Sequence, residues 1–321
     1  MSTGDSSGNP PGRPRHGYLG PPGTFCQMAL DAWPDPQEAE HVPCDSVLAA
    51  LDALRAGTLD AAMVPIENSV EGGVSATLDA LSVGSDVVIV GEVLVPVTFV
   101  IAARPGLTLE EVRAVGTHSH GWAQVRRWVA ANLPTAAYLP TLSTAAAAAG
   151  LDPRGPSVVA YDAAVCAPVA ARIHGLHILA ADIGDSSAAV TRFVLVAAPG
   201  QTPPPTGADK TTLVLYQRDD HPGGLLELLE QFAARGVNLT RLESRPTGEA
   251  MGSYCFSVDV EGHIADARVA ETLMGLKRVC TQVRYLGSYA RADGRRTPPV
   301  EGTTDSDFTG ARAWLGSLLA R

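Results

Sequence analysis

Apolar and polar residues alternate along the chain in two rhythms, which predict two kinds of fold. Between residues 17 and 198, apolar runs of strand length at 60–67, 87–95 and 114–119 are separated by segments with helical periodicity. This alternation predicts an α/β domain with helices on both faces of the sheet, and its length suits two lobes with a cleft between them. Helices are expected at about 46–56, 120–132, 143–150 and 162–174.

The second rhythm begins at residue 211. Strand-like and helix-like segments follow one another there in the order strand, helix, strand, strand, helix, strand, which predicts a ferredoxin-like βαββαβ module. The expected strands are 211–217, 238–246, 252–262 and 283–289, and the expected helices are 223–236 and 266–280.

Composition breaks divide the chain further. The first 16 residues are rich in Gly, Pro and Ser and are expected to be a disordered arm, and the Pro-rich stretch 199–210 is expected to be a linker. The predicted segments are therefore an arm at 1–16, a two-lobed domain at 17–198, the linker at 199–210, the βαββαβ domain at 211–289, and a tail at 290–321 with a short amphipathic helix from 308.

Composition excludes several classes of protein. The formal net charge of −10 argues against a nucleic-acid partner, because neutralising phosphates requires a basic face. No apolar run approaches 18 residues and the arm has no apolar core, so neither a membrane helix nor a signal peptide is expected. Five scattered cysteines without metal-ligand spacing predict reduced thiols in a cytoplasmic protein and no metal.

The negative charge lies in the first domain. Residues 17–199 hold 8 Arg, no Lys and 18 acidic residues, which gives −10. We therefore expect an anion bound there to be held mainly by backbone N–H groups, hydroxyls and amides at turns rather than by a basic patch.

Five segments of the first domain carry candidate chemistry, although each also suits an ordinary structural role. Thr24 starts a predicted helix after a Gly/Pro turn, and Ser143 and Thr144 start another, so all three are expected near helix N–H groups. The two histidines of GTHSHGWAQ alternate and have no partners at metal-ligand spacing, so surface or capping roles are their plainer interpretation. The five segments are 17–25, 64–74, 116–124, 142–150 and 189–196.

Arg192 stands among apolar residues of a predicted strand, where an arginine is costly unless it is paired with an anion. Either a substrate carboxylate or a structural ion pair would satisfy it. Because side chains alternate along a strand, Arg192 is expected to point away from the face that carries Thr191, which makes ligand binding the weaker alternative.

Taken together and in this order, the segments resemble prephenate dehydratase. The matching motifs are GPPGTF from Gly20, PIEN from Pro65, the Thr117, His118 and Gln124 set, STAAAA from Ser143, and TRF from Thr191. The module after the linker resembles the ACT regulatory domain of the same enzymes, through HPGGLLELL at 221–229 and ESRP at 243–246. The resemblance covers about 270 residues, with departures at Cys26, Phe99, Ala189 and Val190.

The resemblance implies a two-lobed, periplasmic-binding-protein-like catalytic domain that converts prephenate to phenylpyruvate with loss of CO2 and water, without a cofactor. Thr191 would then donate a hydrogen bond or a proton to the departing hydroxyl, and Glu67 would be its relay. Asn68 and Gln124 complete the predicted catalytic set. The predicted substrate-binding residues are Thr24, Ser69, Gly73, Thr117, Ser143, Thr144 and Arg192.

The resemblance also implies feedback regulation by L-phenylalanine, bound at an interface between two ACT modules, and hence a homodimer or homotetramer. Arogenate dehydratase, which performs the same chemistry on an amino-acid side chain, and a non-catalytic two-lobed amino-acid sensor remain alternatives. The predicted phenylalanine-binding residues are Gly223, Gly224, Leu225, Asn238, Leu239, Glu243 and Ser244.

Overall fold

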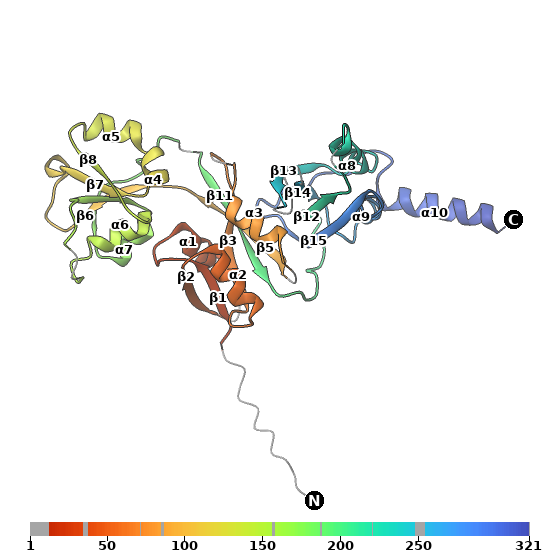
Figure 1. Cartoon of the computed structure of the whole chain (residues 1–321), viewed down its shortest axis with the longest axis horizontal. Helices are drawn as coiled ribbons and strands as arrows, with labels where there is room; N and C mark the ends of the chain where they lie inside the picture. Colours follow the sequence, from red (N-terminus) through yellow and green to blue (C-terminus); the bar gives the residue numbers. More distant parts are fainter. Residues whose placement is uncertain are drawn as a thin grey trace, which may run out of the picture.

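The computed structural model describes residues 13–34, 38–70, 72–84, 87–155, 158–186, 188–219, 221–247 and 254–320. Three sheets follow one another across the molecule, with lobe 1 between lobe 2 and the C-terminal domain (Figure 1). The first strand begins at Arg15, so the end of the segment expected to be a disordered arm is a strand. Residues 1–12 of that segment lie outside the described residues.

Lobe 1 is built on a six-stranded mixed sheet in the order β2-β1-β3-β11-β5, with β4 paired to β3. Strand β11 returns from the far end of the two-lobed domain and lies antiparallel between β3 and β5. The helix expected from residue 46 begins as predicted, with Ser46 Oγ accepting from the N–H of Ala49 at 3.0 Å. The elements of lobe 1 are β1 (Arg15–Leu19), α1 (Phe25–Ala32), β2 (Glu40–Cys44), α2 (Val47–Arg55), β3 (Ala61–Asn68), β4 (Gly72–Gly73), α3 (Ser75–Ser82), β5 (Val88–Pro96) and β11 (Val190–Ala197).

Lobe 2 holds a five-stranded sheet in the order β10-β6-β9-β7-β8. The chain enters this lobe after β5 and returns to lobe 1 at β11, so two crossings join the lobes. Its elements are β6 (Val100–Ala103), η1 (Leu109–Glu111), β7 (Ala114–Thr117), α4 (Ser119–Ala123), α5 (Arg126–Asn132), β8 (Ala137–Pro140), α6 (Thr144–Gly150), β9 (Ala163–Cys166), α7 (Pro168–Ile173) and β10 (His177–Ala180).

Two expected helices of lobe 2 differ from the structure. The helix predicted at 162–174 is wrong in its first half, because Ala163–Cys166 form the buried central strand β9 and only Pro168–Ile173 are helical. Burial between β6 and β7 outweighs the helix propensity of its alanines, and Pro168 is well placed at the start of a helix. The helix predicted at 120–132 is divided into α4 and α5 near Gln124.

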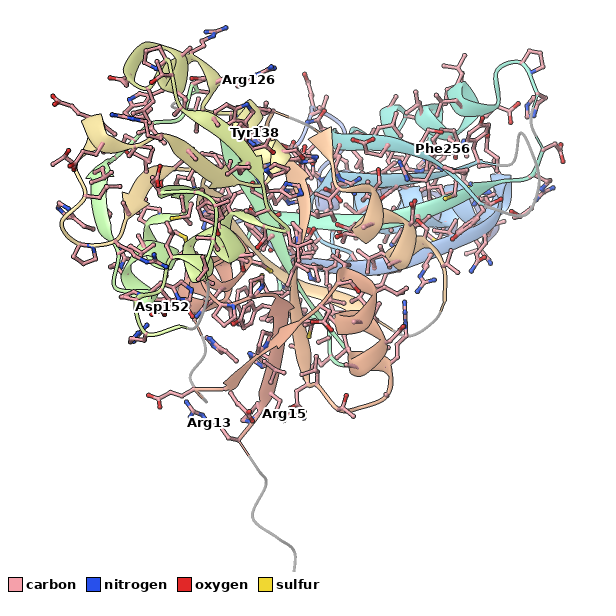
Figure 2. The ribbon with its side chains drawn as sticks, turned by 60° about the vertical axis from the view of Figure 1, so that its left-hand side comes forward. Arg13, Arg15, Arg126, Tyr138, Asp152 and Phe256 are labelled. Atoms are coloured by element: carbon pink, nitrogen blue, oxygen red, sulfur yellow. The ribbon has the colours of Figure 1, made fainter. Side chains whose placement is uncertain are left out.

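The C-terminal domain has the predicted βαββαβ order, in a sheet ordered β13-β14-β12-β15. Its two helices cover one face of this sheet, and the other face packs on lobe 1. Strand β14 shows the alternation, since Phe256, labelled in Figure 2, belongs to the core under the helices while Cys255 belongs to the core shared with lobe 1. The elements are β12 (Asp209–Gln217), α8 (Gly224–Ala233), β13 (Leu239–Pro246), β14 (Tyr254–Glu261), α9 (Ala267–Val279) and β15 (Cys280–Ala290).

The tail carries one more helix, α10 (Asp305–Leu319), which extends away from the body of the molecule (Figure 1). It contains no buried residue, and Arg312 reaches Glu271 of α9 at 2.6 Å. Among the residues that the structure describes, none of the helices combines the length and apolar character that a membrane span requires.

Candidate active site

A pocket of about 300 Å³ lies between the two lobes. Lobe 1 lines it with the β1–α1 turn and the ends of β3 and β11, and lobe 2 lines it with the starts of α4 and α6. The substrate site predicted from separate motifs is therefore assembled in one place from segments more than 150 residues apart in sequence. The polar lining residues are Thr24, Asn68, His118, His120, Gln124, Ser143, Thr144 and Thr191.

Three of these residues cap helices whose starts line the pocket: Thr24, Ser143 and His118. Thr24 Oγ1 accepts from the N–H of Gln27 at 3.3 Å and donates to the carbonyl of Leu19 at 2.8 Å. Ser143 Oγ accepts from the N–H of Ala146 at 2.9 Å. The capping role of Ser143 is confirmed, whereas Thr144, also expected as a cap, is the first residue of α6; the starts of α1 and α6 both lie at the wall of the cavity, where the first N–H groups of a helix lack partners within it.

The ends of β3 and β11 place a hydrogen-bonded pair in the pocket wall. Asn68 Nδ2 donates to Thr191 Oγ1 at 2.8 Å, and Asn68 Oδ1 accepts from the N–H of Val70 at 2.8 Å. The amide is thereby held in one orientation. Because Thr191 Oγ1 accepts from Asn68, its own proton can be directed to an acceptor in the pocket.

A β-bulge determines which side chain of PIEN reaches the pocket. Arg192 pairs with Glu67 and Phe193 pairs with Pro65, so the ladder skips one residue of β3. Pro65 and Asn68 are three positions apart and would face opposite sides of a regular strand, yet both line the pocket. The extra residue of the bulge reverses which side chains at the end of β3 face the pocket. Bulges near functional sites often redirect side chains in this way.

The same bulge turns Glu67 toward the opposite face of the strand pair. Glu67, predicted as the proton relay, is therefore absent from the pocket lining. Glu67 Oε2 lies 3.3 Å from Arg192 Nη1. Arg192 is itself buried, and its guanidinium also contacts Glu92 at 2.5 Å and Asp259 of the C-terminal domain. The structure therefore favours the structural ion pair for Arg192 over the binding of a substrate carboxylate.

Three further predicted substrate-binding residues also lie outside the pocket lining. Thr117 is fully buried and its Oγ1 donates to the carbonyl of Val165 at 2.8 Å. Ser69 Oγ accepts from the N–H of Val190 at 3.0 Å, which ties together the ends of β3 and β11. Gly73 lies against the C-terminal domain, because a Cβ there would stand 2.8 Å from Glu243 Oε1. Thr117 and Ser69 thus bond to the backbone of neighbouring segments, and Gly73 lies at the domain interface.

Two histidines that the sequence favoured as surface or capping residues line the pocket. His118 caps α4, with its Nδ1 accepting from the N–H of His120 at 3.3 Å, and the two rings are 5.1 Å apart. For His118 the matched set of Thr117, His118 and Gln124 already pointed to the site, whereas only the nearby strand end at Thr117 could have indicated His120. Phe25 and Phe99, with ring centroids 5.6 Å apart, form part of the apolar wall.

The electrostatics of the pocket are unusual for an anion site. Its described lining contains no Asp, Glu, Lys or Arg. Burial raises the pKa of the lining thiol Cys26 to about 12, so this group is neutral at physiological pH. No group of three or more residues suited to a metal ion occurs among the described residues. The pocket thus offers hydrogen bonds, imidazoles and helix starts to a small polar ligand.

The predicted phenylalanine-binding residues do not meet within one chain. Gly223, Gly224 and Leu225 start α8 at the end of the sheet where Glu243 and Ser244 also lie. Asn238 and Leu239 lie at the opposite end of β13, about 13 to 20 Å from Glu243 and Ser244 at roughly 3.3 Å per residue. A free amino acid is too short to span that distance.

The fold and the pocket define a two-lobed, periplasmic-binding-protein-like domain with a small-molecule site between its lobes. A family model described as prephenate dehydratase matches residues 16–201, and a model described as ACT domain matches residues 211–278. The prephenate dehydratase of Amycolatopsis methanolica is 43% identical over 305 residues, covering 95% of this chain and 97% of the relative. That of Mycobacterium tuberculosis is 43% identical over 314 residues, covering 95% and 94%.

The solved structures agree. The crystal structure of a prephenate dehydratase from Arthrobacter aurescens in complex with L-Phe has a TM-score of 0.89 and 52% identity, covering 96% of this chain and 100% of that one. The chain belongs to the prephenate dehydratase family and is a hydro-lyase with a C-terminal ACT domain.

Proposed function

We propose that the Asn68–Thr191 pair is the catalytic centre for the dehydration of prephenate to phenylpyruvate. The carrying observation is the 2.8 Å bond from Asn68 Nδ2 to Thr191 Oγ1 in the wall of the pocket between the lobes. In this proposal Asn68 fixes the hydroxyl, and Thr191 directs its proton to the 4-hydroxyl of the substrate as that group leaves. As the ring carboxylate departs as CO2, the electrons of its C–C bond move into the ring and make it aromatic. The C–O electron pair leaves with the oxygen as a hydroxide that Thr191 hydrogen-bonds and that becomes water by taking a proton from solvent.

Thr191 acts as a hydrogen-bond donor rather than through a carboxylate relay. Glu67 faces Arg192 on the other side of the strand pair, and the described lining holds no other carboxylate. A threonine hydroxyl is a weak acid, so stabilising charge on the leaving oxygen is a better role for it than complete proton transfer.

The two carboxylates of prephenate are bound by groups from both lobes. Ser143 and Thr144 at the start of α6, with Gln124, supply donors from lobe 2, and the turn at Thr24 supplies donors from lobe 1. His118 and His120 add imidazole N–H groups at the same wall. Since both lobes contribute, substrate binding favours a closed cleft that orients the leaving groups and excludes water.

The absence of a carboxylate from the described lining favours prephenate over arogenate. Arogenate carries an ammonium group where prephenate carries a keto group, and a buried ammonium requires a carboxylate or several acceptors. We expect a clear preference in kcat/KM for prephenate. Equal kcat/KM values for the two compounds, each assayed through its aromatic product, would contradict this choice.

Two variants test the catalytic centre. Thr191→Val removes the hydroxyl at nearly constant volume and is expected to lower kcat by about 100- to 1000-fold. Thr191→Ser keeps the hydroxyl and should retain most of the activity. Phenylpyruvate, measured by ultraviolet absorbance in alkali, reports both rates, and near-normal turnover by folded Thr191→Val would remove Thr191 from the mechanism.

Feedback regulation by L-phenylalanine through the ACT domain is the second part of the proposal. It is supported by the ACT family match and by the L-Phe complex of the Arthrobacter aurescens relative. The predicted contacts lie at two ends of the ACT sheet, so we propose that one copy supplies Gly223–Leu225 and a second copy supplies Asn238 and Leu239 to a shared site in a homodimer or homotetramer. Glu243 links this end of the sheet to lobe 1 through its contact with Gly73.

Sedimentation with and without phenylalanine, combined with activity titrations, tests the regulatory part. Phenylalanine is expected to change the rate with a coupling of about 1–3 kcal/mol, and Asn238→Ala is expected to weaken that response without changing basal turnover. A monomer that responds normally would contradict the shared site.

The five free cysteines support a cytoplasmic location for the enzyme.

A further inference from the structure

The strand pair that carries the proposed catalytic centre has a second, charged face. Thr191 and Asn68 form one cross-strand pair of β11 and β3, and Arg192 and Glu67 form the next. Thr191 and Asn68 line the pocket, whereas Arg192 points into the interface with the ACT domain. Because Arg192 follows Thr191 directly in the chain, any displacement of Arg192 also shifts Thr191.

Arg192 is shared between the two domains that meet there. In lobe 1 its guanidinium donates hydrogen bonds to Glu92 at 2.5 Å and to Glu67 at 3.3 Å. In the ACT domain it donates to the carboxylate of Asp259 and to the hydroxyl of Tyr289, the latter at 2.8 Å. Its guanidinium thus has anchors from both sides, and Arg192 as a whole is only 5% exposed.

The anchors from the ACT domain are themselves fixed. Asp259 is fully buried and accepts two bonds from Arg241, at 2.9 and 3.0 Å, and one from Thr212 at 2.7 Å. Lys210 of the ACT domain crosses to Glu92 of lobe 1 at 2.9 Å. Asp259 is consequently placed by the ACT sheet and can hold Arg192 in one position.

The charges in this cluster balance. Arg192, Arg241 and Lys210 face Glu67, Glu92 and Asp259. Replacing a buried ion cluster by apolar residues often leaves stability unchanged, so such a cluster is better suited to fixing one geometry than to adding stability. The geometry fixed here is that of the bulged strand pair, because Arg192 is the last residue before the register shift.

We propose that Arg192 is a positioning residue for the dehydratase reaction: the docked ACT domain holds its guanidinium, and Arg192 holds the bulge that aims Thr191 and Asn68 into the pocket. The inference rests on the proposed roles of these two residues. It gives the ACT domain a direct mechanical connection to the catalytic pair, one peptide bond long, in addition to any effect on cleft closure. Arg192 touches no reacting atom and acts through its neighbour.

Asp259→Asn tests the connection from the ACT side, at a residue outside the pocket lining. It keeps the shape of the side chain and removes the charge that holds Arg192. We expect the full-length enzyme to lose about 10- to 100-fold in kcat on prephenate, with KM changed by less than about twofold, because a small misplacement of the catalytic pair affects the rate more than binding. The response to phenylalanine should weaken in parallel.

Glu271→Gln is the matched control, since it also removes an ACT carboxylate from an arginine, but at the surface pair with Arg312. It should leave kcat, KM and the phenylalanine response unchanged. Arg192→Lys, which keeps the charge and loses the fork, should recover part of the rate lost in Arg192→Gln.

Tyr289→Phe keeps the test decisive if Asp259→Asn does not fold, because it removes a single hydroxyl from Arg192. It should lower kcat in the same sense by a smaller factor. Folded Asp259→Asn or Tyr289→Phe enzyme with normal kcat and phenylalanine response would overturn the inference, and so would a rise in KM alone or a loss of rate that only follows the folded fraction. If Thr191→Val also keeps normal turnover, it is the proposed function that fails; if Thr191→Val is inactive, only the inference fails.

Discussion

The two faces of the β3–β11 strand pair have opposite chemical character. On the pocket face, Asn68 and Thr191 meet a described lining without Asp, Glu, Lys or Arg. On the other face, one residue away along each strand, Arg192 and Glu67 join a buried cluster that includes Asp259. The charges of this region join the two domains, whereas the pocket lining offers amides, hydroxyls, imidazoles and helix starts.

The reason for the division is physical. A buried charge needs a fixed partner of opposite sign, which a permanent domain interface provides and an intermittently empty pocket does not. A neutral pocket also allows a dianion to enter without first displacing an internal carboxylate.

Truncating the charged face should affect stability most. Asp259→Ala leaves Arg192 and Arg241 without their shared carboxylate and is expected to destabilise the protein by about 3–5 kcal/mol. Urea unfolding followed by circular dichroism measures the loss. Glu271→Ala at the exposed α9–α10 pair should cost less than about 1 kcal/mol, and equal losses for the two variants would remove the distinction between the sites.

Truncating the pocket face should affect turnover instead. Asn68→Ala releases the Thr191 hydroxyl and is expected to lower kcat by about 100-fold, with a change in unfolding free energy near 1 kcal/mol. Asn132→Ala at the exposed end of α5 is the control and should leave kcat unchanged. A pocket-face variant that greatly lowers the free energy of unfolding but keeps a normal kcat would reverse the assignment of the two faces.

Lowering the pH should destabilise the charged face in particular, because it protonates the carboxyl group of Asp259. Burial opposes its charge, but the guanidinium groups of Arg192 and Arg241 outweigh burial and hold its pKa well below the usual range. A carboxyl with a lowered folded pKa stabilises the fold above its unfolded pKa of about 3.9 and loses that contribution as pH falls toward the folded value. The stability gap between the natural protein and Asp259→Asn should therefore be constant from pH 8 to about pH 5.

Below about pH 4 the same gap should shrink by about 1.4 kcal/mol per pH unit. Unfolding midpoints in urea across this range measure it. A gap that stays constant below pH 4, or that widens as pH falls from 7 to 5, would show that Asp259 does not carry a lowered pKa.

The smallest effect is expected at the neutral thiol of the pocket wall. Because burial raises the pKa of Cys26 to about 12, iodoacetamide at pH 8 should leave Cys26 unlabelled in the native protein. The less buried Cys44 should react first, and peptide mass spectrometry distinguishes the two. Labelling in urea is the control, since all five cysteines should then react. Rapid native labelling of Cys26 would mean that the pocket opens far more than the structure shows.

The sequence alone predicted most of the elements, because their signals are local. The cap at Ser46, the strand at 60–67 and the βαββαβ order all follow from residues close together in the chain. The expected helix at 162–174 failed because its signal was equally local: alanine favours a helix, and only the neighbouring strands β6 and β7 make Ala163–Cys166 a strand.

For the site, the order of the residues already limits the available chemistry to that of the matched motifs, and it predicts that turns rather than a basic patch bind an anion in the acidic first domain. The tertiary structure decided which of those side chains meet. A one-residue bulge sends Asn68 to the pocket and Glu67 to Arg192, and the docked ACT sheet supplies the carboxylate of Asp259 that Arg192 needs. Facing and pairing depend on contacts between residues more than 60 positions apart, and no local pattern encodes them.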